Sequence, residues 1–190
     1  MENDLSKYYE VRSQIGLCDG FSWVGKGSLS KAISLWTHRT HWSQRGPEVD
    51  FEGTRENGIL SYEALQGEVN LRRLSTQLAN YDGECYWHPL KPELDGFRVA
   101  MHRVWYNMIG DDYDEWGLVL NAIERQEMTI DGPKYCSEAG SIAVVQGIPR
   151  YVLEEYLPNK YLEILLNEKR ALRPGGMTLL PIWEKEVRLI

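Results

Sequence analysis

Lys134-Tyr135-Cys136-Ser137-Glu138-Ala139-Gly140 is a short charged turn that runs directly into an apolar helix, with a cysteine in the first helical turn. Gly147 and Pro149 are typical of the end of such a helix. Small and apolar residues between these limits recur at helical spacing, which predicts a helix buried against a sheet; they are Ala139, Ile142, Ala143 and Val145.

The position of Cys136 at the start of this helix favours a reactive thiol. Free backbone N–H groups and the positive end of the helix dipole both stabilise a thiolate. Few local contexts make a cysteine nucleophilic in this way. The alternative is a small apolar residue packed into a helix start, because buried free cysteines are common.

The composition indicates a folded protein of one ordinary domain. The chain has 190 residues, 43% hydrophobic residues, seven Trp and eleven Tyr. The formal net charge is −7 and no basic patch stands out, which argues against nucleic acid as the main ligand and against binding to anionic membranes.

The three cysteines, Cys18, Cys85 and Cys136, are widely spaced and form no C-x-x-C pair. This pattern argues against a disulfide framework or a structural zinc site, and no metal or organic cofactor is expected. It fits a reducing compartment. The polar N-terminus lacks the apolar run of a signal peptide and no stretch is long enough to span a bilayer, which predicts a cytoplasmic protein unless another export route exists.

The pattern along the chain predicts an α+β fold in which helices pack on a small antiparallel sheet. Residues 1–15 form a lead-in and residues 16–190 a single domain. Pro47 indicates an edge strand or a bulge. Strands are expected over 15–24, 48–52, 59–65 and 67–74, with a loop over 53–58. Helices are expected over 29–39, 94–108, 113–123, 136–147 and 151–173 (split at Pro158). Residues 80–92 are expected to form a surface loop or short strand, residues 173–176 a turn, and residues 177–183 a last strand or extended tail.

Several motifs follow one another in an order typical of a known family. They are Ser30-Lys31-Ala32-Ile33-Ser34-Leu35-Trp36-Thr37, Trp42-Ser43-Gln44, Tyr62-Glu63-Ala64, Gly67-Glu68-Val69, Ile109-Gly110-Asp111-Asp112-Tyr113-Asp114, Tyr135-Cys136-Ser137-Glu138 and Pro174-Gly175. In this order the chain resembles the YiiX-like group, a circularly permuted branch of the NlpC-type papain-fold cysteine hydrolases. The resemblance covers residues 16 to 183.

The resemblance implies a catalytic arrangement of cysteine, histidine and a third polar residue that orients the imidazole. Carried across by position, Cys136 takes the place of the nucleophile, Glu63 the orienting place and Gln44 the place of the histidine base. Gln44 is the departure, because a carboxamide does not titrate near neutral pH and so is no general base.

Three explanations for Gln44 remain open. The domain has lost its chemistry and binds a partner, the sequence carries a substitution that silences the thiol, or another histidine serves. His41 is the first histidine to consider, although an odd offset from Gln44 turns it to the opposite face of an extended strand unless the backbone bulges. For His38, His88 and His102 surface or packing roles are expected.

The leading functional hypothesis is a cysteine hydrolase, of amidase, peptidase or esterase type, that works through an acyl-enzyme on a peptide, amide or acyl-ester substrate. Trp23, Trp42 and Tyr135 flank the expected site and are candidates to line a substrate groove. The alternatives are an inactive papain-like domain that binds a peptide or protein, and an acyltransferase. The sequence alone does not fix the substrate or the oligomeric state.

Overall fold

The computed structural model describes residues 3–27, 39–49, 58–65, 67–112, 128 and 135–190. The predicted helices over 29–39 and 113–123 and the predicted loop over 53–58 fall wholly or almost wholly outside these ranges, as do the first motif of the resemblance and His38. The fold described below is that of the remaining chain.

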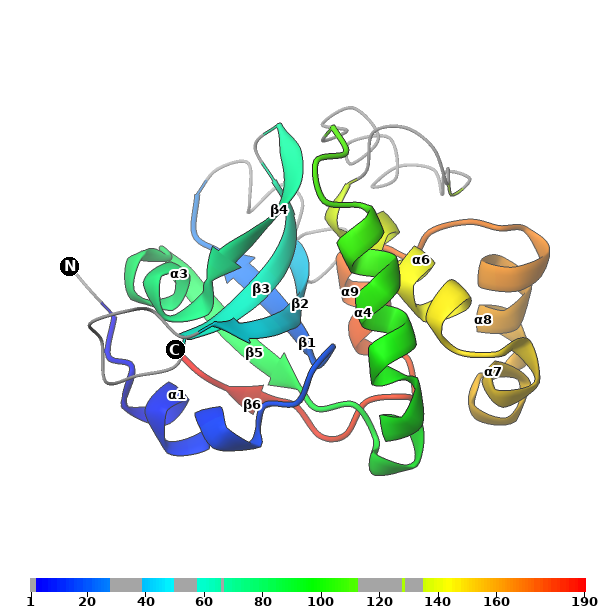
Figure 1. Ribbon diagram of the computed structural model, residues 1–190, viewed down its shortest axis with the longest axis horizontal. Coiled ribbons are helices and arrows are strands. Elements are labelled where there is room, and N and C mark those ends of the chain that lie inside the picture. The colour runs from blue at the N-terminus through cyan, green and yellow to red at the C-terminus, as the bar shows by residue number, and fades with distance from the viewer. Residues whose placement is uncertain (1–2, 28–38, 50–57, 66, 113–127, 129–134) are drawn as a thin grey trace.

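A six-stranded antiparallel sheet forms the centre of the molecule, with the strand order β4-β3-β2-β1-β5-β6 (Figure 1). The strands predicted over 59–65 and 67–74 are present. The strand predicted over 48–52 is replaced by one that begins earlier, at His41, and residues 50–52 lie outside the described ranges. The short strand expected as one alternative within 80–92 forms β5. The strands are β1 (Gly20–Gly25), β2 (His41–Val49), β3 (Gly58–Leu65), β4 (Glu68–Arg73), β5 (Gly83–His88) and β6 (Val187–Arg188).

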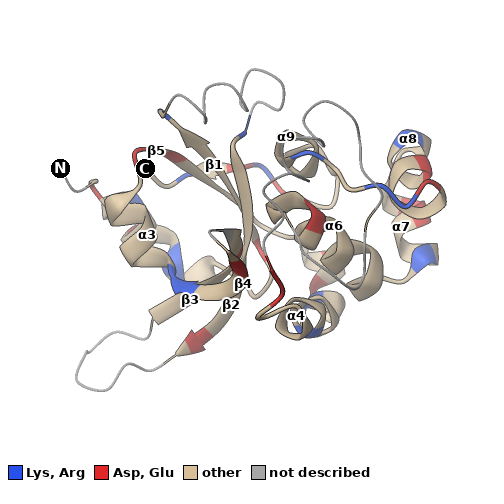
Figure 2. Cartoon of the chain, turned by 90° about the horizontal axis from the view of Figure 1, so that it is seen from above, with Lys and Arg blue, Asp and Glu red and all other residues tan. Residues whose placement is uncertain are grey.

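Helices cover both faces of the sheet, as the α+β prediction requires (Figures 1 and 2). On one face lie α4 (Arg98–Asn107), α6 (Cys136–Gly147) and α9 (Pro174–Thr178), with α7 (Arg150–Tyr156) and α8 (Asn159–Leu162) beyond them. On the other lie α1 (Ser6–Val11) and α3 (Leu74–Asn80), whose residues Tyr8, Val11, Leu74 and Leu78 pack in one cluster with Trp23 of β1. Short 3₁₀ segments, Arg12–Gln14 and Pro92–Phe97, follow α1 and precede α4, and a π-helical turn, Glu163–Asn167, follows α8.

Two proline predictions are confirmed. The pairing of β2 with β3 shifts register between Arg45 and Glu48, which is the bulge indicated by Pro47. The helical segment after residue 150 is interrupted at Pro158, as α7 ends at Tyr156 and α8 begins at Asn159. Proline has no N–H to continue the helical hydrogen bonds.

The predicted turn over 173–176 and the predicted strand over 177–183 are wrong. Pro174 opens the short helix α9, where its missing N–H costs nothing and its fixed φ suits a first helical turn. Met177 is buried in the core, and its carbonyl oxygen accepts a hydrogen bond of 2.7 Å from the indole of Trp183. The last strand, β6, comes later and contains only two residues.

Two glycines let α6 approach β2 closely. Trp42 of β2 is fully buried, and its ring lies over Gly20 on one side and Gly140 of α6 on the other. A Cβ at Gly140 would lie 2.6 Å from the indole ring, and a Cβ at Gly20 would also collide with it. The absence of both side chains therefore fixes the distance between the cysteine helix and the strand that begins at His41.

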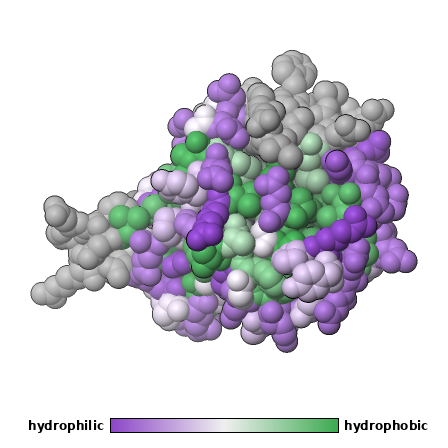
Figure 3. Space-filling view, turned by 45° about the vertical axis from the view of Figure 1, so that its right-hand side comes forward, coloured by the Kyte–Doolittle hydropathy of each residue, from purple (hydrophilic) through white to green (hydrophobic). Residues whose placement is uncertain are grey.

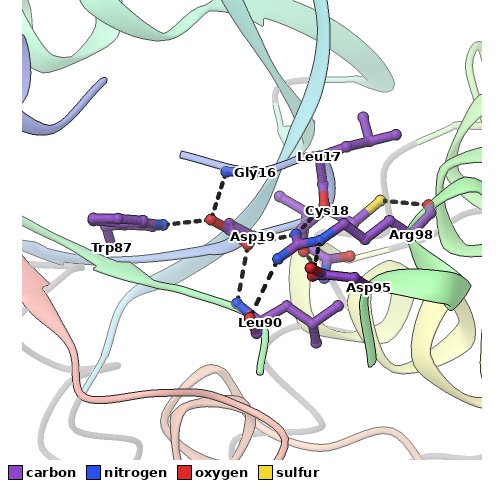
Figure 4. A network of polar contacts seen from close by, with 9 residues as sticks. Gly16, Leu17, Cys18, Asp19, Trp87, Leu90, Asp95 and Arg98 are labelled. Carbon is purple, nitrogen blue, oxygen red and sulfur yellow. Dashed lines mark hydrogen bonds and ion pairs between the residues drawn. The ribbon is translucent and has the colours of Figure 1, made fainter. Parts of the chain in front are cut away.

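A buried ion pair anchors the loop before β1 (Figure 4). The carboxylate of Asp19 is 1% exposed and lies 2.6 Å from the guanidinium of Arg98 at the start of α4. The same carboxylate accepts hydrogen bonds from the backbone N–H groups of Gly16 and Leu90 and from the indole of Trp87. This turn occupies residues that were predicted as strand, and β1 consequently begins at Gly20.

Candidate active site

Cys136 is the first residue of α6 and is completely buried. The residue before it, Tyr135, is extended (φ −100°, ψ 163°), and no side chain caps the helix start. The thiol belongs to a small core cluster with Tyr62 and Ala64 of β3 and Ala139 of its own helix. The helix predicted from the sequence is thus present, with the cysteine at its N-terminus as expected.

His41 is the first residue of β2 and lies near both Cys136 and Glu63. Its Nε2 atom is 3.9 Å from the Oε1 atom of Glu63, and its ring packs 6.2 Å from that of Trp23. Burial by itself lowers the pKa of His41, but the negative charge and hydrogen-bonding capacity of Cys136, together with those of Glu63, raise it to about 9. Neither ring nitrogen has a hydrogen bond of good geometry within the described ranges, so the three groups are neighbours without a tight bond.

Glu63 lies in the middle of β3 and is 1% exposed. One of its carboxylate oxygens accepts a 3.3 Å hydrogen bond from the hydroxyl of Ser61, and that hydroxyl also contacts the side chain of Gln77 on α3 at 2.6 Å. The other oxygen, Oε2, has no hydrogen-bond partner among the described residues. A buried carboxylate in these surroundings can accept a hydrogen bond from an imidazolium.

Gln44 lies on the opposite face of β2 from His41. Its Nε2 atom donates a 3.1 Å hydrogen bond to the carbonyl oxygen of Cys18, and its Oε1 atom accepts one from the indole of Trp105. The pairing of β2 with β1 is regular from His41 to Gln44, so the odd offset turns the two side chains apart. Gln44 is therefore held in a structural hydrogen-bond network.

The strand register explains which residues come together. Gln44 is directly opposite Tyr62 on β3, so Glu63, one residue further, projects to the other face and shares it with His41. His41 thus interacts with both Cys136 and Glu63, whereas Gln44 projects to the face of the sheet opposite Glu63. His41 reaches this position without a bulge, because the bulge in β2 lies beyond residue 45.

The remaining described histidines and cysteines lie elsewhere. His88 shares a 2.8 Å hydrogen bond with Ser22, and His102 shares one of 2.9 Å with the hydroxyl of Tyr62. Burial raises the pKa of Cys18 to about 12 and raises that of Cys85 well above its ordinary value. No histidine is among the groups that shift the pKa of Cys18 or Cys85, so neither thiol is activated in this way.

Comparison with known proteins gives a structural match. No family model and no curated relative matches the chain. A crystal structure of the metalloprotein YiiX from Escherichia coli O157:H7 matches with a TM-score of 0.63 at 20% sequence identity, over 92% of this chain and 97% of that one.

YiiX is described as a metalloprotein. Within the ranges that the structure describes, no group of three or more His, Cys, Asp or Glu side chains is arranged to hold a metal ion. These residues therefore do not fit a metal site, and no chemistry below runs through one. Within the same ranges, none of the helices is long and apolar enough to cross a membrane.

The match to YiiX extends over nearly the whole of both chains. At this level of identity such a match shows the fold. The chain accordingly has the fold of YiiX, a mixed α+β architecture around an antiparallel sheet.

Proposed function

We propose that the protein is a cysteine hydrolase of the NlpC/papain-like kind, with Cys136 as nucleophile, His41 as general base and Glu63 as the residue that orients the imidazole. The observation that carries the proposal is the position of His41 near both Cys136 and Glu63. A nucleophile, a base and an orienting carboxylate in this order are the elements of a hydrolytic triad. Gln44 has no part in the chemistry.

The reaction follows from these roles. In the resting Cys136–His41 pair the proton lies on the imidazole, whose pKa is raised to about 9, and the thiolate sulfur attacks the carbonyl carbon of an amide or ester. Backbone N–H groups in the first turn of α6 stabilise the oxyanion that forms. His41 then returns the proton to the departing amine or alcohol, which leaves a thioester on Cys136. Water, deprotonated by His41, attacks the thioester and releases the carboxylic acid and the free thiol.

The substrate class that this chemistry admits is a peptide or other amide, or an acyl ester. An acyltransferase would share every step up to the thioester and differ only in using an amine or alcohol in place of water. Product analysis with and without such an acceptor separates the two. A reducing compartment such as the cytoplasm suits an enzyme with three free thiols.

Thiol alkylation tests the proposal without a known substrate. The protein is treated with iodoacetamide between pH 5.5 and 9, and the labelled cysteines are identified by mass spectrometry. We expect Cys136 to react faster than Cys18 and Cys85, and to react already near pH 6, where an ordinary thiol of pKa about 8.5 is slow. His41→Gln should abolish the reaction near pH 6, whereas Gln44→Leu should retain it.

The second candidate is a catalytically silent domain that binds a peptide or protein. The observation that favours it is burial: the side chain of Cys136 has no exposed surface and His41 is 7% exposed. If Cys136 resists alkylation in the folded protein at every pH tested, and no esterase or amidase activity appears on thioester, ester and peptide substrates, the silent domain is the better description.

A further inference from the structure

A second concave site lies beside the candidate active site, on the face of the sheet that α9 covers. Its cavity volume is about 480 Å³. One wall is formed by α9 and the facing wall by the segment that precedes β6. The residues that line it are Arg39, His88, Gly175, Thr178, Leu179, Glu184, Lys185 and Glu186.

The deep part of this cavity carries a positive charge. The side chain of Arg39 is 19% exposed and that of His88 is 2% exposed, whereas Glu186 at the rim is 39% exposed. Burial, together with the nearby charge of Arg39, lowers the pKa of His88 to about 3, so this imidazole is neutral at physiological pH. Of the described lining residues, Arg39 is therefore the innermost charged group.

Hydrogen bonds hold Arg39 in place. Its Nε atom donates to the hydroxyl of Ser22 at 3.0 Å, and its guanidinium lies 4.8 Å from the centre of the Tyr86 ring. Because Ser22 receives this bond, its own proton is directed to the Nε2 atom of His88, 2.8 Å away. The guanidinium is thus fixed at a defined position, as in sites that recognise carboxylates.

A carboxylate already occupies part of this site. Both oxygens of Glu186 contact the Nη2 atom of Arg39, at 2.9 and 3.3 Å, and one lies 3.7 Å from the Nε2 atom of His88. Glu186 belongs to a run of exposed residues just before the two-residue strand β6. It shows that a carboxylate fits against Arg39, and its exposure leaves it replaceable by a carboxylate from a ligand.

The cavity adjoins the candidate active site. Arg39 precedes His41 by two residues. The ring of Trp42 links the cavity to the cysteine helix: its centre lies 5.5 Å from that of His88, and it also lies against Gly140 of α6. On the opposite wall α9 packs against α6, where the hydroxyl of Ser141 contacts the sulfur of Met177 at 3.4 Å.

We infer that this cavity binds a carboxylate-bearing portion of the substrate, with the ligand carboxylate displacing Glu186 from Arg39. That the ligand is a substrate rests on the hydrolase function proposed above, whereas the binding of a carboxylate does not depend on it. Exposed Leu179 offers an apolar edge beside the guanidinium. An acidic peptide end or an N-acylated amino acid has the chemistry that such a site recognises.

Binding is measured by isothermal titration calorimetry with N-acetylglycine and, as a neutral match, N-acetylglycinamide. We expect the acid to bind and the amide to bind at least about tenfold more weakly. Arg39→Gln should weaken binding of the acid by about tenfold or more, with the exposed Arg150→Gln as control. Glu186→Gln should tighten it, because the internal competitor is removed.

Circular dichroism shows whether Arg39→Gln is folded. If it is not, the tighter binding of N-acetylglycine expected for Glu186→Gln still tests the inference. Equal affinity for acid and amide, or weaker binding of the acid after Glu186→Gln, would overturn the inference. The same titrations with Cys136→Ser separate it from the proposed function: carboxylate binding should persist in that variant. An unreactive Cys136 thus counts only against the hydrolase, and loss of the Arg39 effect only against this pocket.

Discussion

The Oε1 atom of Glu63 lies 3.9 Å from the Nε2 atom of His41, and both side chains are buried between neighbouring strands of the sheet. The two residues are distant in sequence and meet because β2 and β3 are adjacent and antiparallel. This relationship places a carboxylate beside the imidazole that faces Cys136. It is the basis of the first prediction.

Glu63→Gln should lower the pKa of His41. In the folded protein burial lowers this pKa, but the thiol of Cys136 and the carboxylate of Glu63 outweigh burial and raise it to about 9. The imidazolium therefore stabilises the fold fully below pH 6.5, and this contribution is lost as the pH rises through about 9. In Glu63→Gln the loss should occur at a lower pH.

NMR titration of the His41 ring, with urea unfolding at several pH values, measures both effects. Glu68→Gln, at an exposed position of the neighbouring strand β4, serves as the control for loss of a carboxylate away from His41. A His41 pKa that is the same in wild type and Glu63→Gln would contradict the proposed pairing. Hydrolytic activity, once a substrate is found, should fall with the pKa.

His41→Gln and Gln44→Leu form a matched pair on one strand. His41→Gln removes the proposed general base and should reduce turnover by about 10²–10⁴-fold. Gln44→Leu should leave turnover per folded molecule close to wild type, because Gln44 contacts Cys18 and Trp105 and lies on the other face. It should instead lower the free energy of unfolding by about 1–3 kcal/mol, since the indole N–H loses its partner.

Active-site titration combined with urea denaturation distinguishes activity from stability in this pair. The reverse result, in which Gln44→Leu is inactive and His41→Gln retains activity, would remove His41 from the mechanism. That result would make Gln44, which takes the place of the histidine base in the motif order, the residue needed for activity.

Gly140→Ala should disturb the separation of α6 from β2. The added methyl group would lie 2.6 Å from the ring of Trp42 and 3.2 Å from the Cε atom of Met177, so the helix must move. Overpacking of this kind costs about 1–3 kcal/mol of the free energy of unfolding. Because Trp42 adjoins His41 in β2, alkylation of Cys136 should slow as well.

Gly96→Ala is the control for this substitution. A Cβ at Gly96 has no heavy atom within 4 Å, and Gly96 is not among the glycines with positive φ. Thermal unfolding and the alkylation rate should both stay near wild type in Gly96→Ala. If Gly140→Ala behaves in the same way, the tight approach of α6 to Trp42 does not set the geometry of the site.

Asp19→Asn should destabilise the protein by about 2–3 kcal/mol. The carboxylate is buried and pairs with Arg98, and removal of one member leaves an uncompensated guanidinium near the core. Asp95→Asn removes a second partner of Arg98 that is 58% exposed, and should cost less than about 1 kcal/mol. Urea unfolding of the two variants measures the difference, and equal costs would show that burial of Asp19 is unimportant.

Local signals in the sequence predict much of this fold. Helical spacing and the flanking Gly147 and Pro149 predict α6, and alternation predicts β3 and β4, with Pro47 marking the bulge in β2. These features depend on neighbours in sequence, so composition and period are sufficient. The helix α9 was not predicted, because five residues containing two glycines carry no periodic signal.

The identity of the base is beyond such local signals. His41 and Gln44 are three residues apart, and which of them shares a face with Glu63 depends on the register between β2 and β3. One residue of slip would exchange the two faces. Motif order predicts Cys136 and Glu63 as site residues but not their histidine neighbour, whereas the pairing of Gln44 with Tyr62 places Glu63 on the same face as His41.

The strand order β4-β3-β2-β1-β5-β6 also bears on how the molecule is made. The central strand β1 pairs with both β2 and β5, and β5 lies about 60 residues further along the chain (Figure 1). Figure 3 shows apolar side chains across the middle of one face, with polar side chains among and around them. Since nonlocal pairing is slow to develop, His41 on β2 and Cys136 on α6 come together late in folding, and a partly folded chain would carry an unactivated thiol.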